Sequence, residues 1–219
     1  IDESFMDFSS VQLTEEKAIE IRKKVKQWTG IPVSIGVAPT KVLAKVANYI
    51  AKKHTKKGVF VLQDKKQIIS ILNKFPVKAL WGVGSRYSIF LQERGISTAL
   101  QLVNAHEDWI RKNLTVSGLK LVKELKGITC FPIEEHPTRK KSICTARSFG
   151  RDVSIFEELK EAIGAYATIC AAKLRKEKSC ASLVSVFLNT NPFKQMNDQY
   201  NGYMKIQLYT PTNDSMEIV

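Results

Sequence analysis

The stretch that decides the fold is Ser34-Ile35-Gly36-Val37-Ala38-Pro39-Thr40-Lys41-Val42-Leu43-Ala44-Lys45. Its first half is a short apolar run closed by a proline, and it predicts a strand over Pro32–Ala38. Its second half begins a helix that we predict over Thr40–Lys53. Apolar residues recur along this helix with helical spacing, at Val42, Leu43, Val46, Ala47 and Ile50.

The opposite face of the predicted helix is basic. Lys41, Lys45, Asn48 and Lys52 fall at i, i+4, i+7 and i+11, so they form one polar stripe. The stripe lacks the acidic partners that a solvated helix usually carries. It could therefore hold a triphosphate or a nucleic-acid backbone, and a plain solvated face is the alternative.

The segments on both sides continue the alternation of strand and helix. Upstream, the pattern predicts a strand over Ser4–Ser10 and a helix over Glu15–Trp28, which Gly30 ends. Downstream, it predicts a third short strand over Gly58–Gln63. This βαβαβ-like order indicates an α/β layer.

Composition and charge limit the possible classes of function. The chain has 219 residues, enough for one or two domains, and its 34 lysines and arginines against 21 acidic residues give a net charge of +13. This excess favours a polyanionic partner, first nucleic acid and second an anionic membrane surface. No apolar run approaches the roughly 18 residues of a transmembrane helix. The spacing of the cysteines and histidines is not that of a zinc site.

A glycine-containing turn, Leu80-Trp81-Gly82-Val83-Gly84, lies within a mainly helical region that spans 65–127. Two glycines around an apolar residue, between two short helices, let the backbone N–H groups of the second helix bind phosphate without reading bases. Arg86 lies in the first turn of that second helix. We predict a helix-hairpin-helix DNA-binding element here, with a plain tight turn as the alternative. Thr115–Gly127 contains a weaker hairpin-like stretch at Gly118.

The last part of the chain predicts a second α+β region after a linker with two prolines. We expect strands over Ser142–Gly150, Ser182–Leu188 and Tyr203–Tyr209, and a helix over Ile155–Lys176 that begins with a capping box of Ser154 and Glu157. Basic residues gather around the first of these strands and recur on the last. They could form a basic sheet face against a nucleic-acid backbone, or protect a sheet edge from aggregation, and they are Lys140, Lys141, Arg147, Arg151 and Lys205.

An acidic pair, Asp2-Glu3, stands directly before the first predicted strand. Adjacent side chains on a strand point to opposite faces, so both carboxylates reach one ion only if the backbone bends or one side chain wraps the strand edge. Carboxylate oxygens suit Mg²⁺, which typically takes one or two protein carboxylates together with substrate phosphates. Ordinary surface charge is the alternative.

Taken in order, these motifs resemble the Y-family translesion DNA polymerases. Ile1-Asp2-Glu3-Ser4-Phe5-Met6-Asp7 resembles the second catalytic motif of that family, and Ser34–Lys45 resembles a strand-helix unit of the same palm domain. The hairpin region resembles the thumb. Cys144–Gly150 and Leu208–Ser215 resemble the little-finger domain of the UmuC branch. The resemblance covers essentially the whole chain.

The resemblance implies a multidomain α+β protein: the C-terminal part of a palm over 1–72, a helical thumb over 73–128, a linker over 129–141 and an incomplete little finger over 142–219. It implies that Asp2 and Glu3 are carboxylate ligands of a two-metal Mg²⁺ site. Lys52, with Lys45 on the same face, would bind the incoming triphosphate. The DNA contacts would come from Gly82, Val83, Gly84, Arg86, Lys141, Arg147, Arg151 and Lys205.

The implied function is template-directed DNA synthesis past lesions in bacterial SOS mutagenesis, on primer-template DNA with deoxynucleoside triphosphates. UmuD′-like and RecA-like proteins are the implied partners, a sliding clamp would bind through an absent C-terminus, and the location would be cytoplasmic, without a membrane. The family's first motif and its fingers are expected upstream of Ile1, so this chain alone should bind DNA without polymerising it. The alternatives are a non-catalytic helix-hairpin-helix DNA-binding module and a nuclease or ligase fragment.

Overall fold

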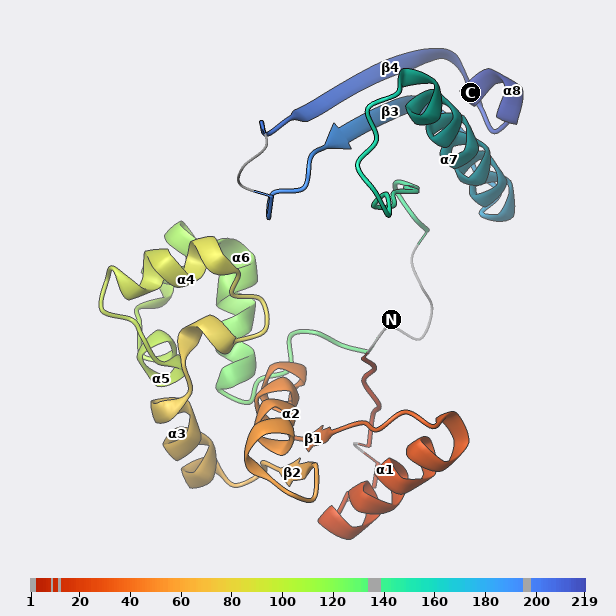
Figure 1. Ribbon diagram of the computed structural model, residues 1–219. Helices are drawn as coiled ribbons and strands as arrows, with labels where there is room; N and C mark the ends of the chain where they lie inside the picture. The colour runs from red at the N-terminus through yellow and green to blue at the C-terminus, as the bar shows by residue number, and fades with distance from the viewer. Residues whose placement is uncertain (1–2, 9, 12, 134–138, 195–197) are drawn as a thin grey trace. The chain divides into compact units, whose positions relative to one another are not determined.

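The computed structural model describes residues 3–8, 10–11, 13–133, 139–194 and 198–219. The chain divides into two units, Ile1–Glu135 and His136–Val219, and each is described by itself (Figure 1). Part of the predicted linker lies outside the described residues. Among the described helices, none is both long enough and apolar enough to cross a membrane.

The first unit begins as the sequence predicts, with helix and strand in alternation. Helix α1, Glu15–Thr29, is followed by strand β1, Ile35–Val37, helix α2, Lys41–His54, and strand β2, Val59–Val61. Gly30 ends α1 in the left-handed conformation, with φ of 74°, and donates its N–H to Lys26. The two strands pair in parallel, so each predicted strand is confirmed in its central residues only.

The predicted strand over Ser4–Ser10 is wrong for the residues that the structure describes, since none of them is in a strand. The described sheet of this unit contains β1 and β2 alone. Residues of the N-terminal segment contact side chains instead: Phe5 lies 5.7 Å from Trp81, measured between ring centroids. Side-chain contacts with distant elements, rather than a backbone ladder, position this segment.

Close packing of β1 on α2 fixes the position of the basic helix. A Cβ built on Gly36 would lie 2.1 Å from the backbone nitrogen of Asn48 and 2.3 Å from the carbonyl oxygen of Ala44. Only glycine therefore fits at this point of the strand. On the side of α2 that faces the core, Val42, Leu43 and Ala47 are completely buried.

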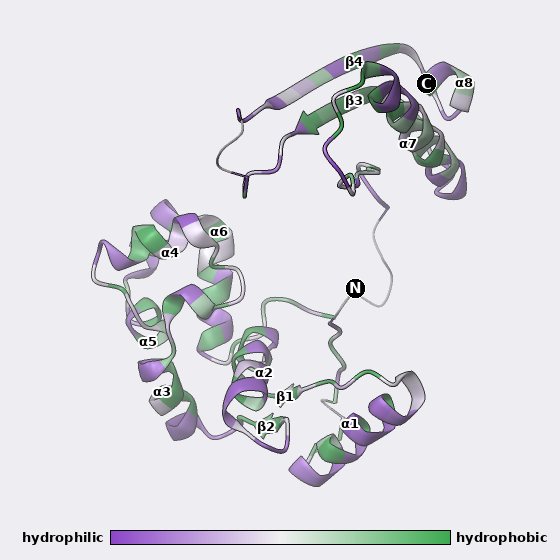
Figure 2. Ribbon diagram, viewed as in Figure 1, coloured by the Kyte–Doolittle hydropathy of each residue, from purple (hydrophilic) through white to green (hydrophobic). Residues whose placement is uncertain are grey.

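Further helices complete the first unit and share its core. They are α3 (Lys65–Lys74), the 3₁₀ turn η1 (Val77–Ala79), α4 (Ser85–Gln92), α5 (Ala99–Val103) and α6 (Glu107–Leu125). One hydrophobic cluster joins α2 to these helices, so residues on both sides of the predicted 72/73 boundary pack together. Figure 2 shows apolar and polar residues interspersed along each of these helices. The division of this unit into a palm and a thumb at residues 72/73 therefore stays a prediction.

The second unit contains helix α7, Phe156–Lys176, strands β3, Ala181–Asn189, and β4, Asn201–Thr212, and a short helix α8, Ser215–Ile218. The strands pair antiparallel. The structure confirms this helix and the two later strands. The predicted capping box is wrong: Ile155 occupies the N-cap position, and no side chain caps α7.

The register of β3 and β4 sorts their side chains onto two faces. Val184 pairs with Ile206 and Val186 with Met204, while Ser185 pairs with Lys205. Directly opposed residues share a face, so one face is apolar and the other carries the lysine. The separation of Met204 and Ile206 from Lys205 agrees with the predicted alternation.

Candidate functional site

The structure brings together two of the predicted site residues that lie far apart in the sequence. The carboxylate of Glu3 forms an ion pair with the ammonium group of Lys45, on the second turn of α2. About a quarter of the Lys45 side chain and about half of the Glu3 side chain are exposed. Asp2, the other predicted carboxylate ligand, lies outside the described residues. The described part of the acidic motif therefore meets the basic stripe.

The four polar residues of the stripe occupy different environments. The ammonium group of Lys41 donates to the carbonyl of Pro132 over 2.7 Å and lies 5.3 Å from the ring centroid of Phe5. Its charge therefore already interacts with groups of the first unit. Asn48 has a buried Oδ1 with no hydrogen-bond partner in the described structure. Lys52 is exposed and lies about 10 Å along the helix axis from Lys45, given 1.5 Å per residue. Lys52 is thus the accessible cation of the stripe, whereas Lys41 and Lys45 already have partners within the first unit.

The described residues fit a hard divalent cation only in part. Glu3 supplies a carboxylate, the ligand type that Mg²⁺ prefers, and it stands beside the basic helix. No group of three or more His, Cys, Asp or Glu side chains that could hold a metal occurs in the described part of the chain. A two-metal site would need carboxylates in addition to Glu3.

The predicted hairpin is a tight turn followed by a helix with a free N-terminus. The N–H of Val83 donates to Leu80 over 3.0 Å, and Gly82 has φ of 91°, a conformation that favours glycine. Gly84 is the N-cap of α4, and no side chain caps that end. Arg86 is exposed in the first turn. The element before the turn is the single 3₁₀ turn η1 and the element after it is α4, so two short helices flank the turn. The helix-hairpin-helix assignment stays a prediction.

A second turn interrupts α6. Thr115 has φ of 62° and ψ of −170°, a conformation that almost only glycine adopts freely and that costs on the order of 1–3 kcal/mol for other residues. The Thr115 Oγ1 accepts the N–H of Ser117 over 3.3 Å. Gly118 has a packing role, since a Cβ there would lie 2.3 Å from the Cβ of Leu114. The glycine drew attention to this stretch, but the unusual backbone belongs to the threonine.

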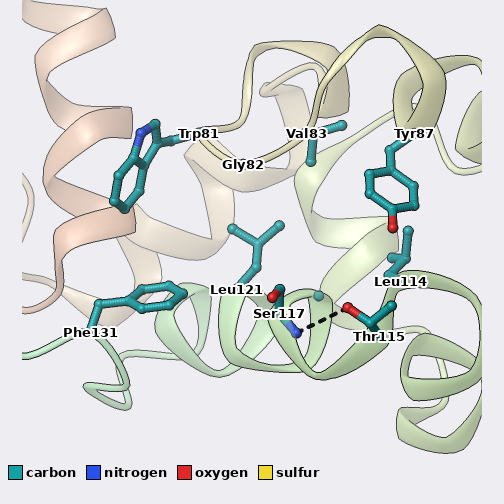
Figure 3. A pocket seen from close by; sticks show the side chains of 10 residues that line it. Trp81, Gly82, Val83, Tyr87, Leu114, Thr115, Ser117, Leu121 and Phe131 are labelled. Carbon is teal, nitrogen blue, oxygen red and sulfur yellow. Dashed lines mark hydrogen bonds between the residues drawn. The ribbon is translucent and has the colours of Figure 1, made fainter. Parts of the chain in front are cut away.

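An apolar cavity of about 320 Å³ lies between these two turns. Figure 3 shows Trp81 and Phe131 on one side of it and Tyr87 and Leu114 on the other. Trp81 and Phe131 meet edge to face, with ring centroids 6.1 Å apart. The two turns therefore flank one shared hollow in the first unit.

The predicted basic sheet face does not form as expected in the second unit. Residues 142–150 are not in a strand. This segment contacts α7 instead: Lys173 donates to the carbonyl of Cys144 over 3.1 Å and to the Thr145 hydroxyl over 2.9 Å. Lys205 lies on β4, whereas the other predicted DNA-binding residues of this unit precede the sheet and lie outside it; they are Lys141, Arg147 and Arg151.

The basic residues of the second unit differ in how far their charges are already compensated. Arg151 forms an ion pair with Glu158, in which its Nη2 lies 2.9 Å from each of the two carboxylate oxygens. Lys140 hydrogen-bonds Glu177 and lowers the pKa of that carboxyl. Lys141, Arg147 and Lys205 are exposed, and none of them forms an ion pair with another described residue. Of the predicted DNA-binding residues in this unit, these three therefore carry charges that are exposed and not compensated by a described carboxylate.

Sequence reasoning missed a buried polar residue of the first unit. Glu124, near the end of α6, is completely buried and accepts hydrogen bonds from two other segments. A signal was available: Glu124 stands three residues after Leu121 and one before Leu125, on the apolar stripe of its helix. A carboxylate on such a stripe requires buried donors.

Comparison with known proteins identifies similar chains over the whole length. The model of the impB/mucB/samB family matches residues 1–49, and that of the family's C-terminal domain matches residues 140–219. The chain is 38% identical to Protein UmuC and 35% identical to Protein SamB, both of Salmonella typhimurium, over 100% of this chain and 53% of each relative. It is 26% identical to DNA polymerase IV of Treponema denticola, over 92% of this chain and 51% of that protein. The chain thus spans about half the length of these relatives.

Proposed function

The chain belongs to the impB/mucB/samB family, the UmuC-like branch of the Y-family polymerases, and we propose that it is the C-terminal palm, thumb and little-finger portion of a translesion DNA polymerase. The observation that carries the proposal is the ion pair between Glu3 and Lys45. It joins the acidic motif to the basic helix, 42 residues away. The family membership supplies the reaction, DNA-directed DNA synthesis.

The chemistry that we propose for the first unit depends on its charges. Divalent ions, when bound, would stabilise the attacking and leaving oxygens of the phosphoryl transfer. Asp2 and Glu3 would hold them from one side, with further carboxylates supplied from outside this chain. Lys45 and Lys52 would bind the triphosphate. Because Lys45 lies against Glu3, a phosphate that reaches this lysine also meets the carboxylate motif.

The contacts that we propose for DNA come from both units. The N–H groups at the start of α4, with the turn Gly82-Val83-Gly84 and Arg86, would bind backbone phosphates. In the second unit, Lys141, Arg147, Arg151 and Lys205 would add charge. Phosphate contacts of this kind position a duplex without selecting a sequence. We also propose UmuD′-like and RecA-like partners, and a sliding clamp, on family membership alone.

Primer extension tests the proposed function. The full-length protein that carries this chain, supplied with Mg²⁺ and the four deoxynucleoside triphosphates, should extend a primer across an undamaged or a damaged template. The chain of 219 residues alone should bind the same DNA without extending it. DNA binding without extension by the full-length protein, with its activating partners present, would instead favour a non-catalytic binding module.

The turn before α4 gives a second test. A Cβ at Gly84 would have open space around it, and the backbone there has an ordinary φ of −76°. Gly84→Val should therefore fold. Its isopropyl group would stand between a phosphate and the helix N–H groups, and we expect DNA affinity to fall about tenfold, or about 1.4 kcal/mol. Valine is a poor N-cap and costs up to about 1 kcal/mol of stability, which thermal unfolding measures separately.

A matched control for this variant exists on the same helix. Gln92→Val places the same isopropyl group at the exposed far end of α4 and should leave the affinity unchanged. Circular dichroism establishes that both variants are folded. If a folded Gly84→Val protein binds DNA as tightly as Gln92→Val, the turn does not contact the nucleic acid.

A further inference from the structure

Glu124 is a buried charge in the part of the first unit where α6 ends. Its side chain is completely inaccessible to solvent. Oε1 accepts the backbone N–H groups of Cys130 over 2.6 Å and of Phe131 over 2.9 Å, and Oε2 accepts that of Val42 over 3.2 Å. Transfer of an unpaired carboxylate out of water costs several kcal/mol, so these three donors are what allows Glu124 to occupy this position.

The three donors come from two segments that Glu124 joins to its own helix. Val42 lies in the first turn of α2, where free N–H groups and the helix dipole favour a negative charge. Cys130 and Phe131 belong to the extended segment after α6. The N-cap residue Thr40 adds a further bond, from its hydroxyl to the Glu124 carbonyl over 2.8 Å. The start of α2, the end of α6 and the segment that follows are thereby held in one arrangement.

This arrangement lies between the two proposed binding features of the first unit. On one side, α2 carries Lys45, which pairs with Glu3. On the other side, Phe131 contacts Trp81 at the edge of the hairpin turn. Lys41 on α2 also binds the segment that contains Phe131, because its ammonium group donates a hydrogen bond to the carbonyl of Pro132. A substitution at Glu124 would therefore alter the position of both α2 and Phe131, which lines the apolar cavity beside the hairpin turn.

We propose that Glu124 is a positioning residue, whose carboxylate fixes the basic face of α2 relative to the hairpin turn that contains Trp81. In this role Glu124 contacts neither the DNA nor the nucleotide. It acts by holding the backbone of Val42 and Phe131 in place. Its effect on nucleotide binding rests on the proposed function, whereas its effect on the arrangement of these segments does not. The proposal therefore has a structural test and a kinetic test.

Hydrogen exchange tests the arrangement without any substitution. The N–H groups of Val42, Cys130 and Phe131 lie at a helix start and in an extended segment, positions that normally exchange fast. Bound to Glu124, they should exchange at least a hundredfold more slowly than the N–H of Arg86, which occupies the equivalent position in the uncapped α4. Equal exchange at Val42 and Arg86 would overturn the proposal.

Glu124→Gln tests the role of the charge. Glutamine keeps the shape, but its amide nitrogen would face a backbone N–H, so at least one of the three bonds is lost. Exchange at the three N–H groups should accelerate at least tenfold. In a background of Trp28→Phe and Trp109→Phe, the remaining Trp81 should become more accessible to acrylamide. Glu107→Gln removes the same charge from an exposed site on α6 and should change neither quantity.

The kinetic test separates positioning from general destabilisation. In primer extension by the full-length protein, Glu124→Gln should raise both the KM for the nucleotide and the Kd for DNA several-fold, because it acts on both the basic helix and the hairpin turn, and should change kcat less than twofold. Parallel losses in all three quantities, or no change beyond that of Glu107→Gln, would overturn the proposed role. If the wild-type protein extends no primer, the proposed function fails, and the exchange and fluorescence results still decide the role of Glu124.

Discussion

DNA binding by the chain should weaken about a hundredfold when the salt concentration rises from 50 to 200 mM. Of the five cationic side chains proposed to contact DNA, Arg151 is already paired with Glu158, which leaves four available; they are Arg86, Lys141, Arg147 and Lys205. Neutralising about four phosphates gives a log–log slope of about −3.6, because each contributes about −0.9. A fluorescence titration with a labelled duplex at several salt concentrations measures this slope.

Two single substitutions in the second unit sharpen the salt experiment. Lys205→Gln removes an exposed and unpaired charge on β4 and should reduce the slope by about one. Arg151→Gln removes a charge that the Glu158 carboxylate already compensates and should reduce it much less. The net charge of +13 is lowered equally in both variants. An affinity that does not depend on salt, or equal slopes for these variants, would contradict the proposed contacts. Unlabelled duplexes of unrelated sequence should compete equally well, because phosphate contacts carry no sequence information.

The helices of this protein were predictable because their signals are local. The boundaries of α2 follow from its apolar stripe, and the structure adds the Thr40 side chain, which accepts the N–H of Leu43. Gly30 likewise ends α1 as predicted. An apolar repeat and the residues at the helix ends act within a few residues of one another, so periodicity and residue type are sufficient to find them.

The two predicted strands that do not form in the described residues, Ser4–Ser10 and Ser142–Gly150, and the site depended on contacts that no local pattern shows. Residues 142–150 have strand-like composition, but their described contacts are with Lys173 on α7. The Glu3–Lys45 pair joins two motifs that the sequence analysis had found separately. Glu124 was missed because its burial depends on backbone N–H donors from distant segments. Thr115 was missed because its conformation belongs to a turn of the backbone within a helix. Such features depend on contacts between residues that are far apart in the sequence, and the local pattern of a single sequence does not reveal these contacts.

Asp2→Asn should reduce primer extension by the full-length protein about a thousandfold. Asparagine keeps the size of the side chain but removes a charge from a proposed metal ligand, and loss of one group that stabilises transition-state charge typically costs 10²- to 10³-fold or more. DNA affinity should change little, because the proposed phosphate contacts lie on other elements. Steady-state extension with saturating nucleotide, alongside a DNA titration, measures both quantities.

Lys52→Ala provides the contrast that identifies the role of each charge. Lys52 is exposed on the helix and is proposed to bind the triphosphate rather than the metal, so its loss should raise the nucleotide KM about tenfold with a smaller change in kcat. Asp2→Asn should instead lower kcat at every nucleotide concentration. Extension by Asp2→Asn at nearly the wild-type rate would show that this carboxylate is not a metal ligand. A KM effect in Asp2→Asn, together with a pure kcat effect in Lys52→Ala, would require the two assignments to be exchanged.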